Sequence, residues 1–204
     1  SSDGGAVLLQ QTDRRLKLLE RFSQCFLDGC NQELVEHSVR EMAAQRVYGL
    51  ALGYEDLNDH ETLRTDPVFG MLAERSDLSP LAGKSTLSRL ELGTGIGDRY
   101  KKITFWKAGV DELMVNVFLE AHTIPPEQII LDMDTTDLPL YGKQEGRFYH
   151  GYYHNYIYLP LYVFCGDHVL CARLREANSD AASGSLVEIK RIIDSGEIGD
   201  VILA

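Results

Sequence analysis

Hydrophobic residues near the start of the chain recur at the spacing of a helix. One stripe has a member every three or four residues, at Leu16, Leu19, Phe22 and Phe26. This period predicts an amphipathic helix. A second helix is predicted over residues 32–54, and Ser85 or Thr86 is expected to cap a short helix over residues 87–91.

The clearest helical stripe lies within residues 110–121, at Val110, Leu113, Met114, Val117, Phe118 and Ala121. It ends before Pro125 and Pro126, which cannot continue a helix. The period then changes, because residues 128–134 form a short apolar run that ends in carboxylates. Such a run is typical of a buried strand that reaches a site. Residues 135–149 are predicted to be a loop.

The remaining pattern predicts a hairpin, a helix and another strand. Residues 152–165 are rich in strand-forming residues, with a bend expected at Pro160, and a turn leads into a second arm over residues 169–174. Asn178 or Ser179 is expected to cap a helix that buries Leu186, Ile189 and Ile193 on one face. Residues 200–204 begin a further strand.

This order predicts an α+β fold in two parts. Residues 1–124 are expected to form a helical region, and residues 125–204 a region ordered strand, hairpin, helix, strand.

Composition agrees with a globular protein, since 44% of the 204 residues are hydrophobic and 25% are charged. The formal net charge of −11 argues against a general nucleic-acid coat protein, which would usually be basic. Locally, residues 84–107 carry six basic and two acidic side chains, whereas residues 108–145 carry one basic and eight acidic. A basic stretch beside an acidic one suits a polyanion held near a metal, although two solvated faces would look the same.

The four cysteines indicate reduced thiols rather than a metal site. Cys25 and Cys30, like Cys165 and Cys171, are too far apart for the short knuckle of a zinc site. No apolar run is long enough to cross a bilayer, and the first residues do not resemble a signal peptide. A cytoplasmic location is therefore expected.

The GKST sequence at residues 83–86 is similar to the end of a phosphate-binding loop. The full pattern requires a glycine at position 78, where the chain has leucine, and no strand precedes it. A turn followed by a helix explains the same residues, and Lys84 could still contact a phosphate.

Residues 132–137 hold three carboxylates and are the strongest candidate for a catalytic or metal-binding segment. Asp132 and Asp134 lie two apart in the predicted strand, so both point to the same face. A Mg²⁺ ion takes one or two carboxylates and leaves positions for water and phosphate. Two such ions can activate an attacking oxygen and stabilise a departing one. The alternative is that these acids cap turns and solvate a loop.

A strand followed by D-x-D-x-T also resembles the first motif of haloacid-dehalogenase-type phosphatases. In that reading Asp132 is the nucleophile and Asp134 the acid/base. Such a fold needs a parallel sheet with crossover helices directly after the motif. The sequence instead continues into a tyrosine-rich hairpin.

A second resemblance covers nearly the whole chain. It is carried, in order, by residues 48–60 (YGLALGYEDLNDH), 81–91 (LAGKSTLSRLE), 131–137 (LDMDTTD), 144–153 (QEGRFYHGYY), 159–168 (LPLYVFCGDH) and 171–175 (CARLR). Together these segments resemble DDE transposases of bacterial insertion sequences, of the group-1 DDE-domain subfamily.

This resemblance implies an RNase H-like catalytic core after a helical DNA-binding region. Three acids would hold two Mg²⁺ ions, with Asp134 as the first acid and Asp132 and Asp137 as weaker candidates. The second acid is expected just past the strand that begins at Val201, and the third in a later helix. The implied reaction is hydrolysis of a DNA phosphodiester followed by attack of the freed 3′-hydroxyl on target DNA. The expected partners are terminal inverted repeats, target DNA and a second copy in a homodimer.

Because the later acids are not among these residues, the sequence is expected to be an N-terminal fragment that is inactive alone. Its binding half could remain functional. The cations expected to contact DNA are Lys84, Arg89, Arg99, Lys101 and Lys102. The alternative to catalysis is a DNA-binding or dimerising remnant that interferes with an intact transposase.

Overall fold

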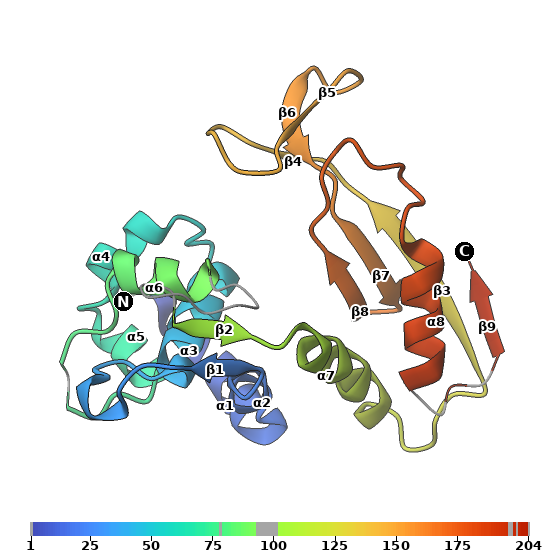
Figure 1. The fold of residues 1–204 in the computed structure, drawn as a ribbon. Helices are drawn as coiled ribbons and strands as arrows, with labels where there is room; N and C mark the ends of the chain where they lie inside the picture. Colours follow the sequence, from blue (N-terminus) through green and yellow to red (C-terminus); the bar gives the residue numbers. More distant parts are fainter. Residues whose placement is uncertain (1, 78, 93–101, 196–197, 199, 204) are drawn as a thin grey trace. The chain divides into compact units, whose positions relative to one another are not determined.

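The computed structural model describes residues 2–77, 79–92, 102–195, 198 and 200–203 (Figure 1). The chain divides into two compact units, residues 1–110 and 111–204. The division falls inside helix α7 (Lys107–Glu120), whereas the sequence pattern placed a boundary after residue 124. The hydrophobic period does not mark this point, because the first turn of α7 continues the same helix.

The first unit is mostly helical, with a small two-stranded sheet. Its α-helices are α1 (Ala6–Leu16), α2 (Leu18–Ser23), α3 (Val39–Ala51), α4 (His60–Leu63), α5 (Pro67–Leu72) and α6 (Lys84–Glu91). Short 3₁₀ turns are η1 (Ser2–Gly5), η2 (Gln32–Leu34) and η3 (Leu57–Asp59). Helices α1, α3 and α5 bury a shared cluster that includes Ala44, Tyr48 and Phe69.

The first predicted helix is interrupted, and its last member lies in a strand. Lys17 adopts a left-handed conformation with φ of 53° and separates α1 from α2. The Asp13 carboxylate then accepts a hydrogen bond of 2.8 Å from the Leu19 N–H at the start of α2. Phe26 belongs to β1 (Phe26–Asp28), which pairs antiparallel with β2 (Ile103–Phe105). Helical spacing cannot distinguish such a three-residue strand, whose partner is distant in sequence.

Two helix starts also differ from prediction because other residues occupy the cap positions. Helix α3 begins at Val39 rather than near residue 32, since the Ser38 hydroxyl accepts a hydrogen bond from the Glu41 N–H. Helix α6 begins at Lys84, with Gly83 as its N-cap, so the expected cap at Ser85 or Thr86 is wrong.

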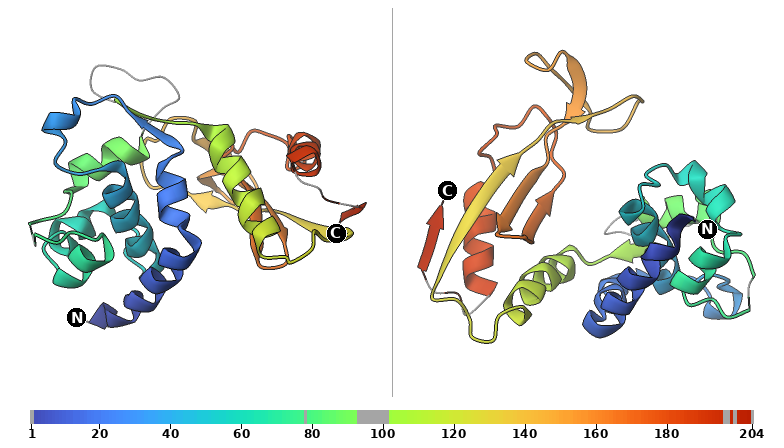
Figure 2. Two further views of the ribbon diagram at one scale, coloured as in Figure 1. Left: turned by 90° about the horizontal axis from the view of Figure 1, so that it is seen from below. Right: turned by 180° about the vertical axis from the view of Figure 1, so that it is seen from behind.

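The second unit contains a four-stranded sheet in the order β8-β7-β3-β9. Its strands are β3 (Gln128–Thr135), β7 (Leu161–Cys165), β8 (His168–Arg173) and β9 (Asp200–Leu203). Strand β3 is antiparallel to β7 and parallel to β9, and helix α8 (Ser185–Ser195) connects β8 to β9. The predicted order of strand, hairpin, helix and strand is confirmed, and Figure 2 shows this arrangement from two further sides.

A second sheet draws on residues 135–149, which were predicted to be a loop, and on the first part of the predicted hairpin arm. Strands β4 (Leu138–Pro139), β5 (Phe148–His150) and β6 (Asn155–Tyr158) pair in the order β4-β6-β5. The bend expected at Pro160 is confirmed, because β6 ends before it and β7 begins after it. The predicted arm over residues 152–165 therefore contributes β6 to one sheet and β7 to the other.

The predicted buried face of α8 is wrong in part. Ile189 and Ile192 pack into the core, whereas Leu186 is 80% exposed and Ile193 is also exposed. The helix begins at Ser185, several residues after the expected caps. Within the described part of the chain, no helix combines the length and apolar character needed to cross a membrane.

Candidate functional site

Strand β3 presents two carboxylates on its open face. Burial alternates along the strand, so Ile129 and Leu131 are buried while Asp132 and Asp134 are exposed. In the register with β7, Asp132 lies opposite Phe164 and Asp134 opposite Tyr162. The prediction that both acids share one face is confirmed, and both lie toward the carboxyl end of β3.

The other face of β3 is anchored in the core of the second unit. Ile129 and Leu131 belong to a cluster of buried side chains from α7, α8 and the neighbouring strands, among them Val115, Phe118 and Ile192. Hydrogen bonding to a strand on each side further restrains the β3 backbone. The two acids are thus carried by a strand whose position is held by packing on one face and pairing at both edges.

An ion cluster ties both helices to β8. The Arg173 guanidinium donates to both oxygens of Asp111 on α7, at 2.6 Å each, and to Glu188 on α8 at 2.6 and 2.9 Å. Arg191 donates to the same Glu188 carboxylate at 2.8 Å. Burial raises the pKa of Glu188, but the hydrogen bonds from Arg173 and Arg191 outweigh it, so the pKa is lowered overall. The cluster fixes α7 and α8 over the sheet that carries the acids.

The donors on β3 fit part of a divalent metal site. The described residues hold no group of three or more His, Cys, Asp or Glu side chains placed to hold a metal ion. Asp132 and Asp134 are oxygen donors open to solvent, which suits an ion that uses one or two carboxylates and keeps its waters. Asp137 is half-buried beyond the end of β3. These acids can therefore supply some of the ligands of one metal ion. Holding two ions would require further donors.

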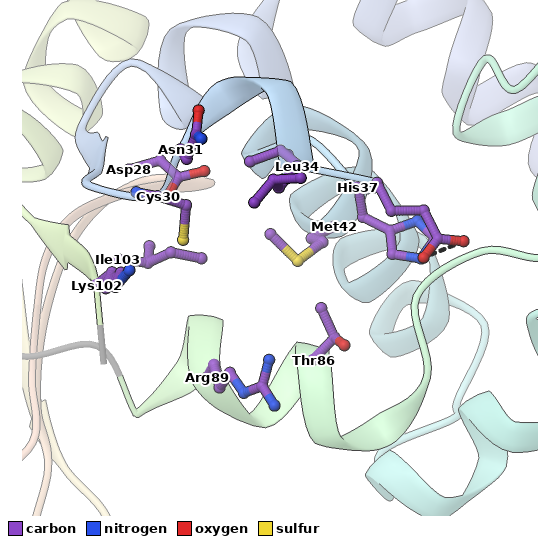
Figure 3. Close-up of a pocket in the computed structure, with 12 residues that line it drawn as sticks. Asp28, Cys30, Asn31, Leu34, His37, Met42, Thr86, Arg89, Lys102 and Ile103 are labelled. Atoms are coloured by element: carbon purple, nitrogen blue, oxygen red, sulfur yellow. Dashed lines mark hydrogen bonds and ion pairs between the residues drawn. The ribbon is translucent and has the colours of Figure 1, made fainter. Parts of the chain in front are cut away.

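Two of the expected DNA-binding cations meet at a pocket in the first unit. The pocket has a volume of about 540 Å³, and Arg89 of α6 and Lys102 both line it. Figure 3 shows Arg89 and Thr86 on α6, facing Cys30, Asn31 and Leu34 across the pocket. Within the described part of the chain, no ion pair engages Arg89 or Lys102.

Charge in this pocket is mixed. A hydrogen bond to Asp28 and then burial raise the pKa of the Cys30 thiol, while the positive charges of Lys102 and Arg89 lower it. The two cations are therefore close enough to influence the same thiol. Met42 and Ile103 add an apolar part to the lining.

The other expected cations do not join this pocket in the described structure. Lys84 precedes Arg89 by five residues on α6, which separates them by about 140° around the helix axis. The Lys84 ammonium instead donates to the Asn58 side chain at 3.0 Å. Arg99 and Lys101 lie outside the described residues.

The family of the chain follows from comparison with known proteins. The family model described as transposase DDE domain group 1 matches residues 1–197. The chain belongs to this DDE transposase family. Comparisons with curated proteins and with solved structures gave no match.

Membership of the DDE family confirms the resemblance found in the sequence and gives a role in DNA transposition. Transposases of this family generally use a divalent metal ion. The exposed carboxylates of β3 accord with that requirement. The match gives no support to the phosphatase reading of the same D-x-D-x-T motif.

Sequence reasoning missed the wall of the pocket that faces α6. Cys30 and Asn31 follow strand β1, which the pattern had assigned to a helix. The only local signal was the cluster of small and polar residues at 28–32, which is typical of a turn. Nothing local could indicate that this turn lies opposite Arg89, because α6 is far away in sequence.

Proposed function

We propose that this chain contributes the first metal-binding strand of a transposase that cleaves DNA and joins the freed end to target DNA. The observation that carries the proposal is the exposed pair Asp132 and Asp134 near the carboxyl end of β3. Asp134 is the proposed first acid of the DDE set, and Asp132 a supporting one. Family membership supports the transposition part of this proposal.

The sheet order supports an RNase H-like core. In chain order, the first three strands of this sheet are antiparallel neighbours, and the fourth returns parallel to the first through α8. Leu131 is in register with Leu203. In a chain that continues in this register, the residues after Leu203 would run beside Asp132 and Asp134. The second acid of the family is expected there.

In the proposed chemistry, Asp134 holds a metal ion. Its carboxylate offers oxygen ligands on an open face, where a DNA phosphate and water can also approach. Divalent ions bound at such a site activate the attacking oxygen and stabilise the departing one. Asp132 adds negative charge on the same face. Because one or two carboxylates cannot position two ions, we expect these 204 residues not to cleave DNA alone.

The proposed partner is DNA, both the terminal inverted repeats and the target. Arg89 and Lys102 support this because no ion pair in the described structure neutralises either of them. Lys84, Arg99 and Lys101 are proposed as further phosphate contacts. A homodimer, a bacterial insertion-sequence origin, Mg²⁺ as the ion and a cytoplasmic location remain part of the proposal.

The metal role can be tested with Mn²⁺ as a paramagnetic probe in NMR spectra of the 204-residue chain. We expect Mn²⁺ to broaden backbone signals at the carboxyl end of β3. Asp134→Asn should remove this broadening, whereas Asp167→Asn, which changes an exposed acid in the β7–β8 turn, should not. Broadening that is unchanged in Asp134→Asn would refute the assignment.

The DNA role can be tested through the dependence of affinity on salt. Each phosphate contact contributes about one to the slope of log affinity against log salt concentration. Arg89→Gln and Lys102→Gln should each reduce the slope by about that amount on a duplex of arbitrary sequence. Lys190→Gln changes an exposed lysine on α8 and serves as the control. Equal slopes in all variants would contradict the proposed interface. DNA binding without Mn²⁺ contact at β3 would instead support the non-catalytic remnant.

A further inference from the structure

The β4-β6-β5 sheet carries an unusual number of exposed aromatic rings. They lie within sixteen residues of the chain, namely Tyr141, Phe148, Tyr149, Tyr152, Tyr153 and Tyr156. Tyr141 and Tyr152 are 94% and 81% exposed, and the other four are between 40% and 49% exposed. Large apolar surface left open to water in this way typically marks a binding site.

These rings are not needed for the core of their own sheet. The buried cluster beneath it consists of Ile157, Leu159 and Ala177. The rings contact one another instead, with centroids 5.5 Å apart for Tyr149 and Tyr156, in an edge-to-face arrangement. In an edge-to-face pair, the ring that receives the edge uses one face, and the other ring keeps its faces free to stack on something else.

Positive charge is interleaved with the rings. The guanidinium carbon of Arg147 lies 4.5 Å from the centroid of the Tyr156 ring, and the guanidinium also donates to the Gly142 carbonyl. Lys143 is exposed nearby in sequence, and Glu145 is the acid between them. Glu176 also lies beside Gly146, so two cations and two acids balance here, within a chain that is acidic overall.

The sheet begins next to the proposed metal-binding acids. Strand β4 starts at Leu138, four residues after Asp134, and Figure 1 shows the β4-β6-β5 sheet beyond the carboxyl end of β3. A strand of DNA whose phosphate reached Asp134 would therefore have its neighbouring nucleotides within reach of the rings.

We propose that this aromatic sheet binds unpaired bases of the DNA strand that is presented to Asp134. The inference rests on the proposed function and deepens it. Aromatic rings interleaved with cations are the combination used by proteins that bind single strands, because every base offers a flat face to stack on. Duplex DNA keeps its bases stacked inside and exposes mainly phosphates. A surface that binds duplex DNA would therefore contact it through cations rather than through tyrosine rings.

The test compares three DNA probes by fluorescence anisotropy with the full 204-residue chain. The probes are a blunt duplex, the same duplex with an oligothymidine tail, and the same duplex with an abasic tail of equal length. The abasic tail retains the phosphates and lacks the bases. We expect the probe with the thymidine tail to be bound more tightly than the probe with the abasic tail. The abasic tail should raise the affinity above that of the blunt duplex only by an amount that falls as the salt concentration rises.

Variants then locate the effect. Tyr149→Ala and Tyr152→Ala should each weaken the preference for the thymidine tail by about fivefold or more. Tyr149→Phe retains the ring and should keep the preference. Leu186→Ala removes an exposed apolar side chain from α8 in the same unit and should change nothing. A tail containing 5-iododeoxyuridine should crosslink on irradiation to residues 141–156.

The possible failures are distinguishable. Equal affinity for the thymidine and abasic tails would overturn the inference, while salt-dependent duplex binding through Arg89 and Lys102 would leave the proposed DNA role standing. Loss of binding to all three probes in the unaltered chain would overturn both. If the alanine variants changed the oligomeric state instead of the tail preference, the rings would form a protein interface and the proposal would be wrong.

Discussion

Replacing Arg173 by methionine tests whether its ion cluster holds the second unit together. Arg173→Met keeps an unbranched apolar stem and removes the guanidinium. The change deletes two hydrogen bonds to Asp111, two to Glu188 and a longer one to the Ala172 carbonyl. Asp111 is 5% exposed, and among the described residues Arg173 forms the ion pair with its carboxylate. Glu188 is also buried but keeps Arg191.

The expected loss follows from the charge that is left behind. Removing one partner of a buried ion pair costs about 3–5 kcal/mol, because the remaining charge stays desolvated. The penalty falls mainly on Asp111, since Glu188 is still neutralised, so we expect a loss of about 4 kcal/mol in the free energy of unfolding. Domains of this size are stable by only about 5–15 kcal/mol. The variant should therefore be close to unfolding in its second unit.

Urea denaturation followed by two probes can separate the units. The single tryptophan, Trp106, lies in the first unit, so its fluorescence reports there, whereas far-UV circular dichroism reports on both. Hydrogen exchange should show lost protection in α8 and β8. Adding Asp111→Asn to Arg173→Met should recover part of the loss, because it removes the unpaired charge.

The pH dependence gives a second check on the same cluster. The pKa of Glu188 is lowered in the folded protein, so its contribution to stability is present above the unfolded value of about 4.3 and is lost as pH falls through the folded value. The difference between the native chain and Arg173→Met should therefore narrow in acid. A loss below about 1 kcal/mol at neutral pH, or one no larger than that of the exposed control Lys190→Met, would refute this reasoning.

Three further outcomes are expected. Gly49→Ala should destabilise the first unit by about 1–3 kcal/mol in urea, because a Cβ there would lie 2.9 Å from the buried His60 ring, whereas Gly70→Ala, which meets nothing within 4 Å, should be neutral or stabilising. Burial and the charge of Arg46 lower the pKa of His60, so the first unit should lose stability as pH falls below about 6.5, and His60→Gln should flatten that dependence in the same titration. Burial raises the pKa of the Cys171 thiol to about 11, so a thiol reagent should label it only when the chain unfolds, and labelling in the native state at neutral pH would contradict its burial.

Local patterns predicted the elements that carry the proposed metal site. The alternation in residues 128–135 indicated a strand with Asp132 and Asp134 on one face, and the structure agrees. Helix α7 was predicted within a few residues, and Pro160 marked the bend between β6 and β7. Each of these signals is contained in a short window, because it depends on backbone geometry alone.

Features that depend on a distant partner were not predicted. Helix α7 buries Val115, which lies off the stripe inferred from spacing, and α8 buries Ile192 instead of Leu186. A helix can turn either of two apolar faces inward, and the choice depends on what packs against it. Strands β4 and β5 likewise lie in or at the end of the predicted loop, because they are short and are recognisable only once they pair with β6.

The sequence by itself determined the DDE family, the position of Asp134 in a strand and the α+β order of elements, because motifs and periodicity are local properties of the chain. Only the tertiary structure decided which cations share a pocket, which face of α8 is buried and how Arg173 meets Asp111 and Glu188. Those outcomes depend on contacts between residues far apart in sequence. Such contacts form where the gain from packing and charge neutralisation exceeds the cost of ordering the chain between them.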